Sequence, residues 1–354
     1  MPANPLVLGV ETSCDDTACA VVDGDGRVIS SVVSSQLSVH RPFGGVVPEM
    51  ASREHLRNWP AVSREALETA GIDLGEVDLI AATRGPGLIG ALLVGLSLGK
   101  AMAYGLDKPF CAVHHLEGHL YSPFLGTAEE PADPPPASFL GLVVSGGHTT
   151  LFEVDHERTR TLAETRDDAM GEVFDKVGKR LGLLYPQGPA VDELAESGEA
   201  SRSPLPVARC SDQSLDFSYS GLKSQTLVEI ERLESQGVDT DLGVVAAKDV
   251  PQTVLDLFAG FRAAAVAQIL DRLERLRRQR PIELLAVSGG VAANRLLRRE
   301  LVDWAVGRSV ELRLVPLVYA GDNAAMIAHT ALIRYRRGLV DDPLVADAAS
   351  RIPI

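Results

Sequence analysis

Short apolar blocks separated by glycine-rich turns open the chain. Residues 6–11 are apolar and β-prone, residues 18–22 resume the pattern, and residues 27–35 read as a third strand. The second and third blocks are joined by Asp-Gly-Asp-Gly at 23–26, where glycine takes a positive φ angle without steric cost. The pattern predicts an N-terminal run of strands that contains a tight hairpin.

A second stretch, residues 140–155, repeats the layout of residues 8–23. In both stretches a serine is followed at the same spacings by a threonine and by a Val-Asp pair. These residues are Ser13, Thr17 and Asp23 in the first stretch and Ser145, Thr149 and Asp155 in the second. Matching spacings inside two apolar strand pairs indicate an internal duplication of a hairpin-led domain.

The rest of the chain alternates strands and helices. Strands are predicted at 77–83, 110–114 and 282–288, and helices at 88–104, 116–121, 168–183, 250–278, 294–304 and 323–337. Residues 127–137 are rich in proline and acids and read as a linker. We therefore predict an α/β fold with duplicated domains, two lobes and a central cleft. The expected N-terminal lobe is 1–135, with a C-terminal helix 323–350 packing back on it, and the expected C-terminal lobe is 136–322.

Composition narrows the class of protein. The chain has 354 residues, 45% of them hydrophobic and 23% charged, which excludes wholesale disorder. Its net charge of −14 repels a polyanion, so a nucleic-acid partner needs a local basic patch or a helper protein. The four scattered cysteines fit a reducing cytoplasm. No signal peptide is apparent, and the apolar stretch 87–99 is too short to span a membrane.

Three glycine- or hydroxyl-rich turns follow predicted strands, at 11–17, 144–149 and 287–294. The free N–H groups of such turns favour anions, especially where a helix follows. Three of them in one chain resemble the phosphate and adenosine loops of the actin, sugar-kinase and Hsp70 superfamily. A literal G-x-G-x-x-G at 85–90 is better explained by tight helix–strand packing. The dinucleotide fingerprint requires an acid at the end of the next strand, which instead ends in His114 and His115.

His115 and His119 are the candidate metal ligands. Positions i and i+4 share a helix face, so both imidazoles can reach one ion. Two surface histidines are the plain alternative. Asp322 is an attractive third ligand at a predicted strand-to-helix junction, although an aspartate there also serves well as a helix N-cap. Glu117 lies on another face of the helix and cannot act as a zinc-protease base.

Charged residues elsewhere in the chain have a structural interpretation as well as a functional one. Asp168, Glu172 and Lys176 share a helical face, which usually makes a solvated ion-pair ladder. Asp175 lies on another face, where an aspartate beside small residues can approach ribose hydroxyls. Gly188 and Asp192 mark a loop-to-helix entry. The basic run 272–280 reads as a helix end whose charges complement the helix dipole.

Taken together, these motifs resemble the TsaD/Gcp family of tRNA adenosine threonylcarbamoyltransferases. The matching segments run in order along nearly the whole chain. They are residues 9–17, 44–55, 85–91, 114–119, 144–149, 174–176, 216–223, 288–294 and 322–328. The chain departs from the family pattern at Asp16, where Glu is common, at Gln187, where Gly is usual, and at 320–321, where Ala-Gly replaces Cys-Thr.

The resemblance implies an actin-like fold and one iron or zinc ion held by His115, His119 and Asp322. It implies that the adenylate substrate is bound by Val143, Val144, Ser145, Gly146, Gly147, Asp175, Gly188, Asp192 and Asn294. Threonylcarbamoyl-AMP would then donate its acyl group to N6 of the adenosine 3′ of the anticodon, in tRNAs that read codons beginning with A. Asp15 or Asp16 would orient or deprotonate the amine, and the residues do not decide which.

The expected partners are tRNA, a TsaB-like subunit and a TsaE-like ATPase, in the cytoplasm and without a membrane. A sugar-kinase-like phosphotransferase is the main alternative, because it shares the fold. That enzyme would need Mg²⁺ and would gain nothing from a two-histidine site. A metalloprotease is a third alternative, but this chain lacks the glutamate that a zinc protease needs beside the first histidine. A non-catalytic scaffold for tRNA modification would tolerate the loss of His119.

Overall fold

A computed structural model describes residues 1–354 except 1–3, 156–157, 209, 211, 213 and 244–246. The chain divides into two compact units. Unit 1 comprises Met1–Pro136 together with Val315–Ile354, and unit 2 is Ala137–Leu314. The C-terminal segment therefore returns to the N-terminal unit.

Unit 1 is built on a five-stranded sheet in the order β3-β2-β1-β4-β5. Its strands are β1 Val7–Glu11, β2 Asp16–Val22, β3 Val28–Ser35, β4 Leu79–Gly85 and β5 Phe110–His114. Strand β1 pairs antiparallel with β2 and parallel with β4. Because β1 has neighbours on both edges and helices on both faces, all five of its residues are buried, Glu11 included.

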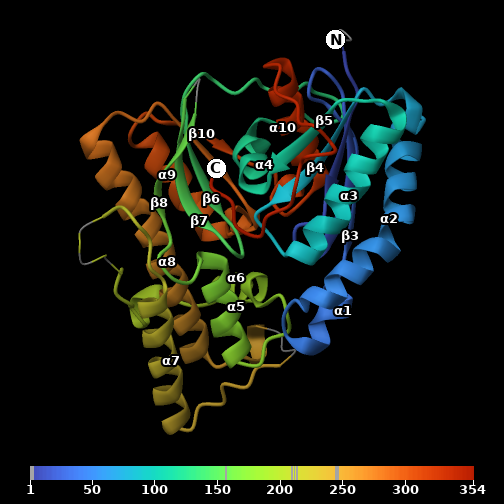
Figure 1. Ribbon diagram of the computed structural model, residues 1–354. Helices are drawn as coiled ribbons and strands as arrows, with labels where there is room; N and C mark the ends of the chain where they lie inside the picture. Colours follow the sequence, from blue (N-terminus) through green and yellow to red (C-terminus); the bar gives the residue numbers. More distant parts are fainter. Residues whose placement is uncertain (1–3, 156–157, 209, 211, 213, 244–246) are drawn as a thin grey trace. The chain divides into compact units, whose positions relative to one another are not determined.

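Helices cover both faces of this sheet (Figure 1). They are α2 Pro48–Ala70, α3 Ile89–Leu106, α4 His115–Tyr121 and α10 Ala324–Arg336, whereas the short α1 Leu37–His40 follows β3. Leu8 and Val10 join the core cluster that includes residues of α2 and α3. Side chains alternate between the faces of a strand, so Gly9 and Glu11 face the other way, toward α10. A Cβ atom on Gly9 would lie 2.3 Å from the carbonyl oxygen of Ala324.

Unit 2 repeats this topology. Its sheet order is β10-β9-β6-β7-β8, in which β6 pairs antiparallel with β7 and parallel with β9, as β1 does with β2 and β4. The strands are β6 Phe139–Val144, β7 Thr149–Val154, β8 Thr159–Glu164, β9 Leu284–Ser288 and β10 Glu311–Leu314. The helices are α5 Met170–Arg180, α6 Gln187–Ala195, α7 Ser220–Ser235, α8 Gln252–Gln279 and α9 Arg295–Val306. The predicted duplication is therefore visible in the strand order.

Three features differ from the sequence expectations. The second unit ends at Leu314 rather than at residue 322, which assigns Asp322 to unit 1. The helix predicted at 323–337 is confirmed as Ala324–Arg336, but it does not extend to residue 350 as the lobe assignment expects, because Gly338 takes a positive φ angle of 74° and Pro343 follows. Helix α2 was not predicted. It carries Pro60 in its interior, which argues against a helix in a sequence.

The glycines of 85–90 and of α3 serve close packing, as expected. A Cβ atom on Gly87 would lie 2.6 Å from the Ser13 carbonyl oxygen, and one on Gly95 would lie 2.2 Å from Thr12 Oγ1. Helix α3 therefore lies directly against the loop that follows β1. Any larger residue would push this loop, and the acidic residues in it, away from the sheet.

Two helices, α3 and α8, are long and apolar enough to cross a membrane by length and composition. The apolar window of α8 is 78% buried within the protein, as in a core helix, whereas that of α3 is 33% buried. Helix α3 is longer than the apolar stretch 87–99 on which the sequence expectation rests. One or two such helices occur commonly in soluble proteins and are weak evidence for a membrane.

Because β1 and α10 are in close contact, adding one methyl group at Gly9 should strongly affect stability. Gly9→Ala should lower the free energy of unfolding by about 1–3 kcal/mol, because its Cβ meets backbone that cannot rotate away. Gly105→Ala in α3 is the control. No atom lies within 4 Å of its added Cβ, and it should stabilise by about 0.5–1 kcal/mol. Urea unfolding monitored by circular dichroism measures both. A Gly9→Ala protein as stable as the parent would contradict this packing.

Candidate functional site

The two candidate histidines lie where β5 passes into α4. His114 ends the strand and caps the helix, since its Nδ1 accepts a hydrogen bond from the Leu116 N–H at 3.2 Å. Its Nε2 donates to the Ile352 carbonyl oxygen at 3.1 Å. Both nitrogens of His114 are thus occupied by backbone. His115 and His119 occupy the next positions on α4, and both are buried.

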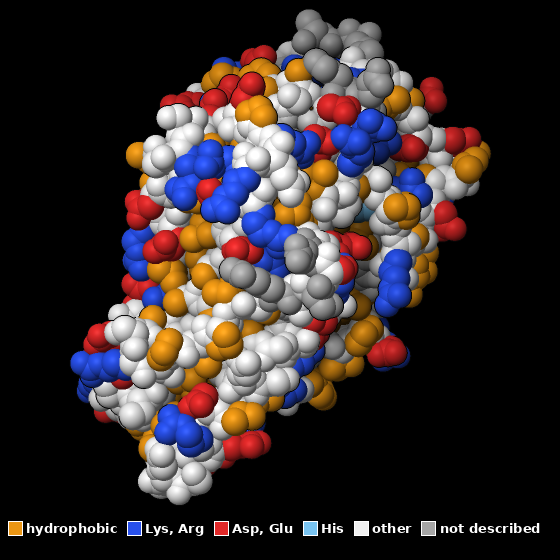
Figure 2. Space-filling view, turned by 90° about the vertical axis from the view of Figure 1, so that its left-hand side faces the viewer, with side chains coloured by type: hydrophobic (Ala, Val, Ile, Leu, Met, Phe, Trp, Pro, Cys, Tyr) orange, Lys and Arg blue, Asp and Glu red, His pale blue; other side chains and the backbone are white. Residues whose placement is uncertain are grey.

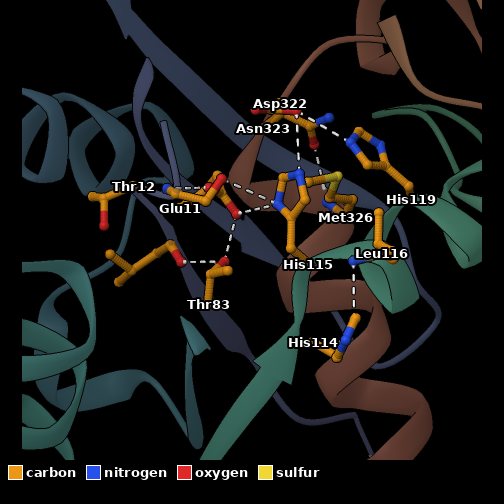
Figure 3. A network of polar contacts seen from close by, with 12 residues as sticks. Glu11, Thr12, Thr83, His114, His115, Leu116, His119, Asp322, Asn323 and Met326 are labelled. Atoms are coloured by element: carbon orange, nitrogen blue, oxygen red, sulfur yellow. Dashed lines mark hydrogen bonds and ion pairs between the residues drawn. The ribbon is translucent and has the colours of Figure 1, made fainter. Parts of the chain in front are cut away.

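Asp322 lies just before α10, after a short 3₁₀ turn, Leu317–Tyr319, rather than after the expected strand. The N-cap of α10 is Asn323, whose side chain accepts a hydrogen bond from the Met326 N–H at 2.9 Å. The plain alternative for Asp322, helix capping, is therefore fulfilled by its neighbour. Its carboxylate points toward the histidines instead (Figure 3).

The three side chains form one cluster. Asp322 Oδ1 lies 3.1 Å from His119 Nε2 and 3.6 Å from His115 Nε2. The two rings are nearly perpendicular, with centroids 4.7 Å apart. One nitrogen or oxygen from each residue falls within 4.8 Å of the others. Two imidazoles and one carboxylate that converge in this way fit a transition-metal ion and leave coordination positions open for a substrate.

The charges around this cluster favour a cation. Burial opposes an imidazolium, but Asp322 and Glu11 outweigh it and raise the pKa of His115 to about 9. Burial likewise opposes the Glu11 carboxylate, but the charge of His115 and its hydrogen bond outweigh burial and lower the pKa of Glu11. Two acids thus share one positive group. A divalent ion bound here would replace the proton that His115 otherwise carries.

Asp15 and Asp16 lie in the loop between β1 and β2 and at the start of β2, and both are half-buried. Burial and then the charge of Asp322 raise the pKa of Asp16 to about 7. The loop is anchored from α2, because the buried His55 donates through Nε2 to the Cys14 carbonyl oxygen at 3.0 Å. A carboxyl group with a pKa near 7 is suited to accept a proton at neutral pH.

In unit 2, the turn after β6 carries the expected loop. Val143, Val144 and Ser145 are buried, whereas Gly146 and Gly147 are exposed. No atom lies within 4 Å of a Cβ built on either glycine, so their backbone is open to a ligand. Two other glycines pack tightly against the backbone of this loop. A Cβ on Gly171 of α5 would lie 2.7 Å from the Ser145 carbonyl oxygen, and one on Gly289 would lie 2.3 Å from that of Val144.

The other four predicted residues of unit 2 fall into two pairs. Asp175 Oδ1 accepts a hydrogen bond from the Gly188 N–H at 2.7 Å, which joins α5 to α6. Asp192 Oδ1 accepts from Asn294 Nδ2 at 2.7 Å, and its Oδ2 accepts from the Arg295 N–H at 3.1 Å. Helix α5 adjoins the glycine loop as well as α6. That these four residues bind the adenylate remains a prediction.

Two buried charged residues that contact predicted site residues were not singled out from the sequence. Arg262 of α8 donates to Asp192 Oδ1 at 2.9 Å and pairs with Glu196. Glu11 contacts His115 in unit 1. The available signal was the same in both cases, a charged residue inside an otherwise apolar segment, because such a residue is rarely buried without a partner.

The structural interpretation of the remaining charged motifs, as ion pairs within the protein, is supported. Lys176 pairs with Asp168 and Glu172, and Glu117 pairs with Arg334 at 3.6 Å. Much of the basic run 272–280 is used inside unit 2. Arg272 is fully buried and donates to the Asp216 carbonyl oxygen at 3.0 Å, and Arg277 pairs with Glu274. This run offers little free positive charge to a nucleic acid.

Comparison with known proteins decides the family. A family model described as TsaD, tRNA N6-adenosine threonylcarbamoyltransferase, matches residues 27–329. The chain belongs to this family. A curated TsaD-family relative, a tRNA N6-adenosine threonylcarbamoyltransferase of Syntrophobacter fumaroxidans, is 46% identical over 98% of this chain and 99% of its own length. A relative of the same name from Thermus thermophilus is 44% identical, with 98% of both chains covered.

Solved structures support the fold. HypF of T. kodakarensis matches 95% of this chain and 48% of its own length at a TM-score of 0.60, with 16% identity. The activator of 2-hydroxyisocaproyl-CoA dehydratase from Clostridium difficile, with bound ADPNP, matches 94% of this chain and 96% of its own at a TM-score of 0.51, with 12% identity. At such low identity these likenesses concern the fold alone. They agree with the predicted actin-like α/β architecture.

Because its pKa is raised, the ionised Asp16 side chain should lower the stability of the fold at neutral and higher pH. A carboxyl whose pKa is higher in the folded chain than its unfolded value of about 4 loses folding free energy as pH rises from that value to about 7. In metal-free protein, Asp16→Asn should therefore raise the melting temperature at pH 8, and raise it less at pH 5. Asp25→Asn, in the exposed hairpin turn, is the control. An equal gain at both pH values would show that Asp16 titrates normally.

Proposed function

We propose that this chain transfers the threonylcarbamoyl group of threonylcarbamoyl-AMP to N6 of an adenosine in tRNA, 3′ of the anticodon. The observation that carries the proposal is the near full-length similarity to curated enzymes of this name, at 46% identity. The two-histidine cluster in unit 1 and the open glycine loop in unit 2 supply the chemistry that such a reaction needs. The further restriction to tRNAs that read codons beginning with A rests on the family resemblance.

The reaction joins a weak nucleophile to an activated acyl group. The N6 nitrogen attacks the carbamoyl carbon, a C–N bond forms, and the C–O bond to the phosphate breaks. AMP leaves with the electron pair, and the amine gives up a proton. The protein therefore has three tasks: it holds the adenylate, it stabilises negative charge as AMP departs, and it accepts one proton.

We assign these tasks to residues as follows. The N–H groups of Gly146 and Gly147 receive the adenylate phosphate, since they are exposed and sterically open. Asp175, Gly188, Asp192 and Asn294, with Val143, Val144 and Ser145, shape the nucleoside site. Asp16 accepts the amine proton, because its pKa of about 7 suits transfer at neutral pH. Asp15 orients the amine.

His115, His119 and Asp322 would hold one divalent metal ion. A mixed set of imidazole nitrogen and carboxylate oxygen suits iron or zinc, whereas Mg²⁺ and Ca²⁺ prefer oxygen alone. When bound, the ion supplies Lewis-acid stabilisation of an oxygen of the substrate. We propose Fe²⁺ as the native ion, with Zn²⁺ as the alternative.

The chain needs partners to bind tRNA. Its net charge is −14, and on the face drawn in Figure 2 small groups of basic side chains alternate with acidic and apolar ones. Helices α2 and α3 also expose apolar side chains, which are Leu56, Ile89, Leu93 and Tyr104. We propose that a TsaB-like subunit covers this surface and that a TsaE-like ATPase acts in turnover. The four free cysteines support a cytoplasmic location.

Single-turnover transfer tests the proposed function. Purified chain, the two partners, labelled threonylcarbamoyl-AMP and unmodified tRNA are mixed, and the tRNA is digested to nucleosides. We expect label on threonylcarbamoyladenosine, and its loss in His119→Ala because one ligand of the cluster is removed. Asp25→Asn, in the exposed hairpin turn, is a control outside both the cluster and the glycine loop. Omitting the TsaB-like subunit should also abolish the product.

Other outcomes separate the alternatives. In a separate assay of the isolated chain with ATP and Mg²⁺, phosphorylation of a small acceptor, together with no labelled nucleoside in the transfer assay, would support a phosphotransferase. Full transfer by His119→Ala would contradict a role for the cluster in the reaction. Tight binding of tRNA by the isolated chain at physiological salt would contradict the need for a partner.

A further inference from the structure

Glu11 is a carboxylate placed where carboxylates are rarely found. It ends the apolar strand β1, and its side chain is fully buried. No Lys or Arg lies within ion-pair distance of Glu11 in the described part of the chain, where its charged neighbour is His115 at 3.3 Å. Burying a carboxylate without compensation costs several kcal/mol, on the order of a whole domain's stability margin. Such a residue is expected to have a definite partner.

Each oxygen of Glu11 has a defined contact (Figure 3). Oε1 accepts a hydrogen bond from the Ser13 N–H at 2.5 Å. Oε2 accepts from the Thr83 hydroxyl of β4 and lies 3.3 Å from His115 Nδ1. Two neutral donors from two segments thus fix the carboxylate in one orientation. The third contact of the group is the imidazole.

This arrangement gives the two nitrogens of His115 different tasks. Nδ1 faces Glu11 and the Ser13 hydroxyl, whereas Nε2 faces Asp322. A carboxylate accepts hydrogen bonds and does not donate them, so Nδ1 carries the proton in the neutral ring. The lone pair is then left on Nε2, which is the nitrogen that points into the cluster.

His119 provides a contrast within the same cluster. Its Nε2 lies 3.1 Å from Asp322, but its buried Nδ1 has no hydrogen-bond partner in the described part of the chain. Of the two imidazoles, therefore, His115 is the one with a carboxylate at Nδ1, on the side of the ring away from Asp322. Carboxylates that accept a hydrogen bond from a ligating histidine strengthen it as a ligand and fix its ring.

We propose that Glu11 is a positioning residue, which holds His115 as the Nδ1–H tautomer and thereby sets the affinity of the cluster for its metal ion. Glu11 itself does not ligate the ion or touch the substrate. The inference rests on the proposed metal role of His115, His119 and Asp322. It accounts for a buried acid at the end of β1 that the transfer reaction itself does not require.

Zinc affinity of the isolated full-length chain tests this proposal without tRNA or partners. Apo protein is prepared with a chelator and titrated with Zn²⁺ against a competing chromophoric chelator. Glu11→Gln keeps the shape of the side chain and removes its charge. We expect its affinity to fall by about 10–100-fold. Glu11→Asp, which restores the charge at a shorter reach, should recover part of the loss.

Two control variants separate positioning from simple damage to the fold. Thr83→Val removes one donor to Glu11 and leaves the carboxylate in place, and Ser13→Ala removes the other polar group near His115 Nδ1. Both should bind zinc far more tightly than Glu11→Gln. The melting temperature of each apo protein identifies any variant that is merely unfolded.

The ring nitrogens of the zinc-loaded parent protein provide a test that needs no substitution. Long-range ¹H–¹⁵N correlation spectra should show His115 with a protonated Nδ1 and a metal-bound Nε2. A protonated Nε2 with zinc on Nδ1 would overturn the proposal. So would unchanged zinc affinity in folded Glu11→Gln, or an equal loss in Ser13→Ala. A parent protein that binds no zinc or iron would instead remove the metal site, and this proposal with it.

Discussion

Burial of the Glu11 carboxylate against His115 is the interaction on which the rest of unit 1 depends. The charge is fully buried, so the sheet must supply donors from the following loop and from β4, and an imidazole from α4. These contacts join the carboxyl ends of the parallel strands β1 and β4 to the start of α4. The acidic loop that holds Asp15 and Asp16 begins from the same place.

Close packing of α10 on β1 places the third residue of the cluster. Gly9 allows α10 to lie directly on β1, and α10 begins immediately after Asp322 and its capping neighbour Asn323. The Asp322 carboxylate is therefore presented to histidines that lie far from it in sequence. Unit 2 has the same strand order. There the turn after β6 keeps exposed glycines and no buried acid, which suits an anionic ligand rather than a cation.

Local patterns made much of this architecture predictable from the sequence. Apolar periodicity indicated the strands and most helices, and the i, i+4 spacing of His115 and His119 indicated a shared helix face. Long-range packing was not predictable in the same way. Nothing local shows that Glu11 contacts His115, that Asn323 rather than Asp322 caps α10, or that Arg262 reaches Asp192. Helix α2 was missed because tertiary packing against β2 and β3 outweighs its internal Pro60.

Anomalous diffraction from crystals of the iron- or zinc-loaded chain, collected at the absorption edge of the metal, tests the central claim most directly. We expect one peak in unit 1, about 2.0–2.2 Å from Nε2 of His115, from Nε2 of His119 and from the Asp322 carboxylate. The Glu11 carboxylate should lie outside the coordination sphere, beside His115 Nδ1. A peak bonded to Glu11 itself, a peak away from these residues, or no peak after loading would contradict the account.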